Sequence, residues 1–226
     1  MNLRINPKLL ILILLINSAT LYCMQPYTLL QKRAAAQEIL SIANQSRDLR
    51  LINEKFKQEN TETTSWFECH TAKLQNQLRK EFNQDLSVKI MGSRRWNTNH
   101  ILSDIDAVIV TNSINLDNLL LALGKYYETQ YKDVKQFSTK TKAGLYLFVL
   151  KNFADKELGE MKLEYTFQTP EVNQSIIEGM EDKLPTKFKT QEEKTLYALE
   201  MMEAVYNENA EKQTQLKEWT RILATK

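Results

Sequence analysis

The sequence is poor in the residues that build cross-linked, disordered or repetitive proteins. Its 226 residues include 2 cysteines, 4 prolines, 5 glycines and 2 histidines. So few cysteines exclude a disulfide framework and a cysteine-based zinc site, and the isolated His70 and His100 form no metal-binding pattern. No internal repeat is present, and 42% of the residues are hydrophobic. We therefore expect one globular domain with helical additions.

No apolar run is long enough to span a membrane, and the longest one present lies at the N-terminus. Arg4 and Lys8 precede the segment LLILILLI at residues 9–16. This run is shorter than the ~20 apolar residues of a membrane span, and a basic start followed by a short apolar run is typical of an export signal. Residues 1–23 are thus predicted to direct export or secretion. Membrane contact is expected only if this segment stays uncleaved as an anchor, and the alternative is a buried N-terminal helix.

An excess of positive charge is lacking as well. Loss of residues 1–23 would leave 28 basic and 28 acidic residues. A neutral chain has no strong basic patch of the kind that grips long nucleic acid by its backbone. Cys69 would then be the only cysteine, and we expect it to be a small buried residue.

Helical spacing of apolar residues dominates residues 24–85. A first helix is predicted over residues 34–56. The polar stretch QENTETTS, residues 58–65, is expected to break or cap it. A second helix is predicted over residues 66–82.

The spacing of hydrophobic residues then changes from helical to alternating, which predicts that residues 86–170 form the core domain, built around strands. Alternating or β-branched runs predict strands at 86–92 and 105–110, and a hairpin formed by 144–153 and 161–168 that Pro170 closes. A helix is expected over 116–131, and residues 171–226 form a C-terminal helical segment with a long helical pattern over 190–223. The predicted class is α+β, with a small mixed β-sheet flanked by N-terminal and C-terminal helices.

Three acidic residues stand out in these strands. Asp104 and Asp106 are two positions apart, so both side chains leave the same face of a strand, where they repel unless a cation binds. Glu164 lies on the polar face of the strand MKLEYTFQ. If that strand lies beside residues 105–110, three carboxylates meet. Such a set suits Mg²⁺, or Mn²⁺, shared with substrate phosphates.

A bend suited to anions precedes the acidic pair. Gly92 and Ser93 follow a predicted strand, and glycine lets the backbone approach a phosphate closely. The next amides, at a helix N-terminus, would point at the anion, and Arg94 and Arg95 add positive charge. An anion cradle beside metal ions is the physical requirement for transferring a nucleotidyl group.

The segments GSRRWNT and SDIDAVIV resemble the signature of the DNA polymerase β-like nucleotidyltransferase superfamily. The resemblance implies that Gly92 and Ser93 contact a triphosphate, and Thr98 matches a residue of the same motif. Arg94, by its charge beside the bend, is a further nucleotide-binding candidate. The resemblance also implies that Asp104 and Asp106 bind metal, and that Glu164 binds metal and acts as general base. Two departures are present: Asn97 replaces a glycine, and Glu164 replaces the commoner aspartate. Asparagine tolerates positive φ best among the other residues, so the loop can persist.

The resemblance implies a metal-dependent nucleotidyltransferase that moves an NMP from an NTP to a hydroxyl acceptor. The acceptor could be an RNA end, a nucleotide, a small molecule or a protein, and the C-terminal helices are expected to wall the base and the acceptor. The alternatives are a RelA/SpoT-like pyrophosphokinase, or a non-catalytic interaction protein that retains the fold. Lys140 and Lys142 could reach a phosphate, and Trp96 could fill the core or touch a base.

Overall fold

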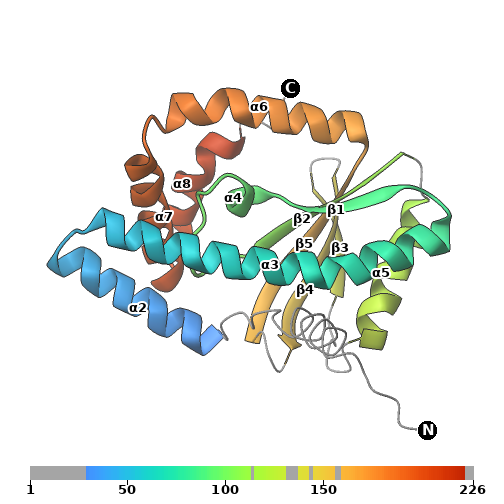
Figure 1. Cartoon of the computed structure of the whole chain (residues 1–226), viewed down its shortest axis with the longest axis horizontal. Coiled ribbons are helices and arrows are strands. Elements are labelled where there is room, and N and C mark those ends of the chain that lie inside the picture. Colours follow the sequence, from blue (N-terminus) through green and yellow to red (C-terminus); the bar gives the residue numbers. More distant parts are fainter. Residues whose placement is uncertain (1–28, 113–114, 131–136, 143–144, 156–158, 222–226) are drawn as a thin grey trace, which may run out of the picture.

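The computed structural model describes residues 29–112, 115–130, 137–142, 145–155 and 159–221 (Figure 1). Within these ranges helices surround a small mixed sheet, which confirms the predicted α+β class. The predicted leader, residues 1–23, lies outside the described ranges. None of the helices in these ranges has the length and apolar character needed to cross a membrane.

The sheet is five-stranded, with the order β1-β2-β5-β4-β3. All neighbouring pairs are antiparallel except β2 and β5, which run parallel. The predicted hairpin is present as β4 and β5. The strands are β1 Leu86–Ile90, β2 Ile105–Thr111, β3 Phe137–Lys142, β4 Leu145–Asp155 and β5 Gly159–Gln168.

The two faces of the central strand pair differ in character. Ile105, Ala107 and Tyr165 point into the main core, where α3 and α5 cover the sheet. On the opposite face Val108 packs against Ile177 of α6. Because side chains alternate along a strand, the acidic positions of β2 and β5 share this second face. The helices that pack on the sheet are α3 Leu49–Phe82, α5 Leu116–Gln130 and α6 Pro170–Lys187.

The N-terminal helices differ from the prediction at two places. The helix expected over 34–56 ends early: α2 spans Leu29–Gln45 and α3 starts at Leu49, with Asp48 accepting a hydrogen bond from the Leu51 amide as N-cap. The break expected at residues 58–65 is wrong, because α3 runs through them for 34 residues. Tertiary contacts override the weak helix propensity there, since Glu59 is buried and bonded to Lys32 and Arg94.

The C-terminal segment also has more breaks than its sequence suggested. Helix α6 begins at Pro170, with Thr169 as N-cap, so Pro170 opens a helix as well as ending the hairpin. The long pattern after it divides into α7, Gln191–Tyr206, and α8, Ala210–Arg221. Glu208, between them, has φ 55°. Helix α7 packs on α2 and α3 through Ala198 and Met202.

A chain of polar side chains crosses the main core. Nε2 of His70 lies 3.0 Å from the hydroxyl of Tyr127, which lies 2.6 Å from the hydroxyl of Tyr165. Burial, with a smaller contribution from Lys73, lowers the pKa of His70 to about 4. The ring is therefore neutral at pH 7 and structural. Its neighbour Cys69 is exposed, so the expectation of a buried cysteine is wrong.

Candidate functional site

The glycine of the predicted anion bend lies directly against an acidic side chain. Gly92 has φ +62°, and a Cβ at that position would lie 2.0 Å from Oδ2 of Asp106. The amide of Met91 donates a 2.8 Å hydrogen bond to the carbonyl oxygen of Asp106, which holds the two strand ends together. Only glycine fits this combination of backbone conformation and close approach. The bend and the carboxylate are thus one structural unit.

The three acidic residues lie on β2, immediately before it, and on the neighbouring strand β5. In the parallel ladder of β2 and β5, Asp106 is the register partner of Glu164. Both are partly exposed, while the flanking Leu163 and Tyr165 are buried on the opposite face. Asp104 immediately precedes β2. The convergence of strands that the sequence hypothesis required is therefore present in the backbone.

A cavity of about 350 Å³ opens at this point. Gly92, Ser93, Thr98, Asp104 and Asp106 line its floor. The remaining wall is largely apolar and comes mostly from the C-terminal helices: Trp96, Ile176, Met180, Tyr197 and Lys217, with Met91. The cavity thus places five of the predicted nucleotide and metal residues beside an apolar wall.

A second cavity, of about 370 Å³, adjoins the first. The two cavities share Ser93, Thr98, Asp104, Tyr197 and Lys217. This one differs in charge, because Lys32 and Arg33 of α2 also line it. The site therefore consists of an apolar compartment and a basic compartment that meet at Asp104.

The sequence suggested that Arg94 binds the nucleotide, but its side chain lines neither cavity. The short helix α4, Gly92–Arg95, turns its guanidinium inward, where only 2% of the residue is exposed. It donates two 3.0 Å hydrogen bonds to the carboxylate of Glu59 and further bonds to the carbonyl oxygens of Ser103, at 2.9 Å, and Asp104, at 3.2 Å. A direct contact between Arg94 and a nucleotide does not match this geometry.

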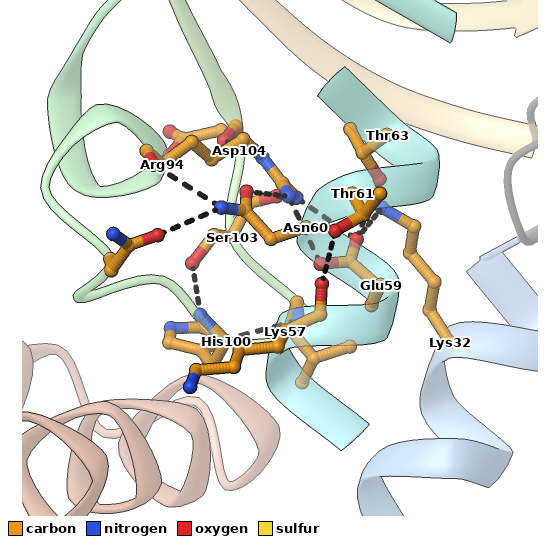
Figure 2. A network of polar contacts seen from close by, with 12 residues as sticks. Lys32, Lys57, Glu59, Asn60, Thr61, Thr63, Arg94, His100, Ser103 and Asp104 are labelled. Carbon is orange, nitrogen blue, oxygen red and sulfur yellow. Dashed lines mark hydrogen bonds and ion pairs between the residues drawn. The ribbon is translucent and has the colours of Figure 1, made fainter. Parts of the chain in front are cut away.

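The partner of Arg94 is a residue that sequence reasoning missed (Figure 2). Glu59 of α3 is 1% exposed, and Nζ of Lys32 lies 3.4 Å from its Oε1. Burial would raise the pKa of Glu59, but the charges of Arg94 and Lys32 outweigh it and hold the pKa below its usual value. Burial lowers the pKa of Lys32 against the pull of Glu59. The available signal was helical spacing: Glu59 falls three positions after the buried Phe56.

The loop between the bend and Asp104 is held by its own hydrogen bonds. Asn97 has φ 55°, the left-handed conformation for which asparagine was expected to substitute for glycine. Thr98 is buried, and its amide donates a 3.0 Å bond to the carbonyl of Ser93. Nδ1 of His100 accepts a bond from the Leu102 amide, and burial, followed by the charge of Arg94, lowers the pKa of His100 to about 3. His100 is therefore buried within the loop and helps to hold its backbone.

Trp96 follows α4 and lines the apolar compartment. Trp96 packs against Met180 and the helix α6 wall, and the guanidinium of Arg95 lies 5.1 Å from its ring centroid. Trp96 therefore fills space between elements and also lines the cavity. The side chains of Lys140 and Lys142 lie outside the described residues, so their predicted phosphate contacts stay predictions.

The carboxylates fit a divalent cation only in part. Asp104 and Asp106 line one cavity, and Mg²⁺ is commonly held by one or two carboxylates together with substrate phosphates. Across the described ranges, no three or more acidic, histidine or cysteine side chains form a group that could hold a metal ion. The residues therefore suit a cation completed by phosphate oxygens, and a ligand set that includes Glu164 stays a prediction.

Comparison with known proteins gives only distant similarities. No family model and no curated protein matches the chain. A chain in a structure of the GLD-2/RNP-8 complex aligns with a TM-score of 0.41 and 9% identity, covering 76% of this chain and 62% of that one. Small alarmone synthetase 1 from Bacillus subtilis, bound to its product pppGpp, aligns with a TM-score of 0.32 and 11% identity, covering 70% of this chain and 94% of that one. This chain spans less than two thirds of the first structure's chain, and neither protein's activity transfers to it on similarity this distant.

Proposed function

We propose that this chain is a metal-dependent nucleotidyltransferase that moves a nucleoside monophosphate from an NTP to a hydroxyl acceptor. The observation that carries the proposal is the contact between Gly92 and Asp106 at the floor of a cavity that Asp104 also lines. A glycine bend for phosphate and a carboxylate pair for a cation meet there, and Glu164 is the register partner of Asp106 on the adjacent strand.

The two compartments suit the two ends of a nucleotide. The apolar wall of Trp96, Met180 and Tyr197 offers aromatic and thioether surface to a nucleoside. The basic compartment offers Arg33 and Lys217 to phosphates. Because Asp104 lines both, a nucleotide that spans them carries its phosphates past the carboxylate pair.

In the proposed reaction Asp104 and Asp106 would hold Mg²⁺ or Mn²⁺. The cation would supply charge neutralisation of the phosphates and stabilise the leaving pyrophosphate. Ser93 at the bend would orient the α-phosphate. Glu164, beside Asp106, would accept the proton of the acceptor hydroxyl as its oxygen forms a bond to the α-phosphorus and the bond to the β-phosphate oxygen breaks.

The test is label transfer from each α-³²P-labelled NTP in the presence of Mg²⁺ or Mn²⁺ and a cell extract. The wild type is compared with Asp104→Asn/Asp106→Asn and with Asp117→Asn/Asp182→Asn, which changes two exposed aspartates outside both cavities. We expect labelling by the wild type and the second variant alone. Glu164→Gln is expected to lower kcat by about 10²–10⁴-fold with a small change in KM.

The by-product separates the alternatives. Release of pyrophosphate supports nucleotidyl transfer, whereas release of AMP from ATP would show pyrophosphoryl transfer instead. Absence of both nucleotide binding and turnover by the wild type, over all four NTPs and both cations, would replace the proposal with a non-catalytic role.

A further inference from the structure

We propose that the buried charge triad Lys32–Glu59–Arg94 is a positioning device that locks the phosphate-binding bend to the carboxylate Asp104. This inference deepens the proposed function and rests on it. Arg94 follows Ser93 directly in the chain, so its backbone belongs to the bend. Its side chain donates a 3.2 Å hydrogen bond to the carbonyl oxygen of Asp104, 10 residues later. One residue therefore joins both halves of the candidate site.

All three nitrogen atoms of the Arg94 guanidinium donate hydrogen bonds within the protein. Nη1 and Nη2 form a bidentate pair with the carboxylate of Glu59, and Nη1 also lies 3.3 Å from Oδ1 of Asn60. Nη2 bonds to the carbonyl of Ser103 at 2.9 Å. A planar guanidinium makes these bonds in one fixed orientation, so the direction of the Ser103–Asp104 backbone is set by the direction of Glu59.

Glu59 is in turn fixed by the N-terminal helices. Its Oε1 accepts a 2.9 Å bond from the hydroxyl of Thr63 one helical turn later, and Lys32 reaches it from α2. Figure 2 shows the resulting line of contacts from α2, through α3, to Arg94 and Asp104. Asn60 adds a second connection from α3, a 3.3 Å bond from its amide to the carbonyl of Arg94. The N-terminal helices thus hold the loop that carries Asp104.

Stability alone is a poor account of this triad. Burying three charged groups requires desolvation of each, and replacement of a buried ion triad by apolar residues of similar volume is often neutral or stabilising. Orientation is the property that apolar residues cannot supply here, since they donate nothing to the carbonyls of Ser103 and Asp104. Displacement of a catalytic group by about 1 Å can lower the reaction rate by about 10²-fold. The position of Asp104 therefore has a direct consequence for the proposed reaction.

The decisive variant removes the whole triad: Lys32→Met/Glu59→Met/Arg94→Met. It leaves no lone buried charge, so we expect the thermal midpoint to stay within about 5 °C of the wild type. We expect Mn²⁺ affinity, measured by electron paramagnetic resonance, to fall about 10–100-fold. We also expect faster amide hydrogen exchange at residues 101–106. The matched control is Glu38→Met/Lys55→Met, which removes the 2.8 Å ion pair between α2 and α3 and should change neither measurement.

A folded triple variant with wild-type Mn²⁺ affinity and unchanged exchange at residues 101–106 would overturn the inference. If the triple variant does not fold, Arg94→Lys decides: lysine keeps the charge beside Glu59 but lacks the fork that reaches both carbonyls, and the same two changes are expected. A wild type that binds neither Mn²⁺ nor NTP would refute the proposed function, whereas hydrogen exchange at residues 101–106 still tests the anchor.

Discussion

The two halves of helix α3 differ in the side chains that they bury. Towards its C-terminus Phe67, Leu74 and Leu78 enter the main core against the sheet. Towards its N-terminus Glu59 and Thr63 are buried beside the apolar Ile52 and Phe56, and Glu59 contacts charged partners on α2 and α4. Figure 1 shows this single helix running along the molecule, from the sheet to the helices around the candidate site.

The difference separates the residues that make the fold from those that hold the site. The apolar half gains stability from every group removed from water. The charged half requires desolvation, but its Glu59 orients Arg94, which donates directed hydrogen bonds to the backbone around Asp104. We therefore expect substitutions in the two halves to separate stability from site geometry.

The largest expected effect is that of removing the central charge alone. Glu59→Leu would leave Arg94 and Lys32 buried without their carboxylate, so the free energy of unfolding should fall by about 3–5 kcal/mol. Urea denaturation measures this, with Glu54→Leu on the exposed side of the same helix as the matched control. A loss no larger than that of the control would show that the buried charges are solvated in solution.

The apolar half should lose stability without losing the site. Leu74 is fully buried, so Leu74→Ala should lower the free energy of unfolding by about 2–5 kcal/mol through lost transfer energy and a cavity. The folded fraction should bind Mn²⁺ with wild-type affinity, because Leu74 contacts no part of the triad. The exposed Asn76→Ala is the control. A parallel fall in Mn²⁺ affinity would mean that both halves support the site.

The same contrast explains what the sequence could reveal of the fold. The strands and the helix after β2 follow from hydrophobic period, because apolar burial leaves a periodic trace. The uninterrupted course of α3 does not, because residues 58–65 read as polar until their partners on α2 and α4 are known. The start of α6 had a local signal in Thr169 and Pro170, but Pro170 also fits the end of a strand.

For the candidate site, the local sequence pattern indicated where residues lie better than it indicated what their side chains contact. The bend at Gly92 and the pair Asp104 and Asp106 lie together as their spacing suggested, because strand alternation and glycine conformation are local properties. The inward direction of Arg94 was not predictable, since it depends on Glu59, 35 residues earlier. A charged side chain next to a glycine bend can point into the cavity or into the protein interior. Its orientation depends on whether a tertiary partner such as Glu59 is present.

Lowering the pH should have a smaller effect on the free energy of unfolding, through the buried His70 of α3. The pKa of His70 is about 4 in the folded chain against 6.5 in the unfolded one. The unfolded state therefore binds a proton first, and stability falls as the pH drops from about 6.5 to about 4, by about 3 kcal/mol for this group. His70→Gln should reduce this slope in urea denaturation between pH 7 and 4, while the contribution of His100 persists in both proteins. Equal slopes would refute the assignment.

A change at the bend is expected to affect the site most directly. Gly92→Ala places a methyl group on a backbone at φ +62°, which alone costs about 1–2 kcal/mol, and the displacement of Asp106, whose Cγ would lie 2.7 Å from the new Cβ, adds to this cost. The added Cβ would lie 2.0 Å from Oδ2 of Asp106, so the carboxylate must move away from the bend. Label transfer and Mn²⁺ binding should therefore fall although the chain stays folded. Gly179→Ala, inside α6, is the matched control and should leave both unchanged. A fully active Gly92→Ala would show that the contact between the bend and Asp106 has no part in the reaction, and it would remove the observation on which the proposed function depends.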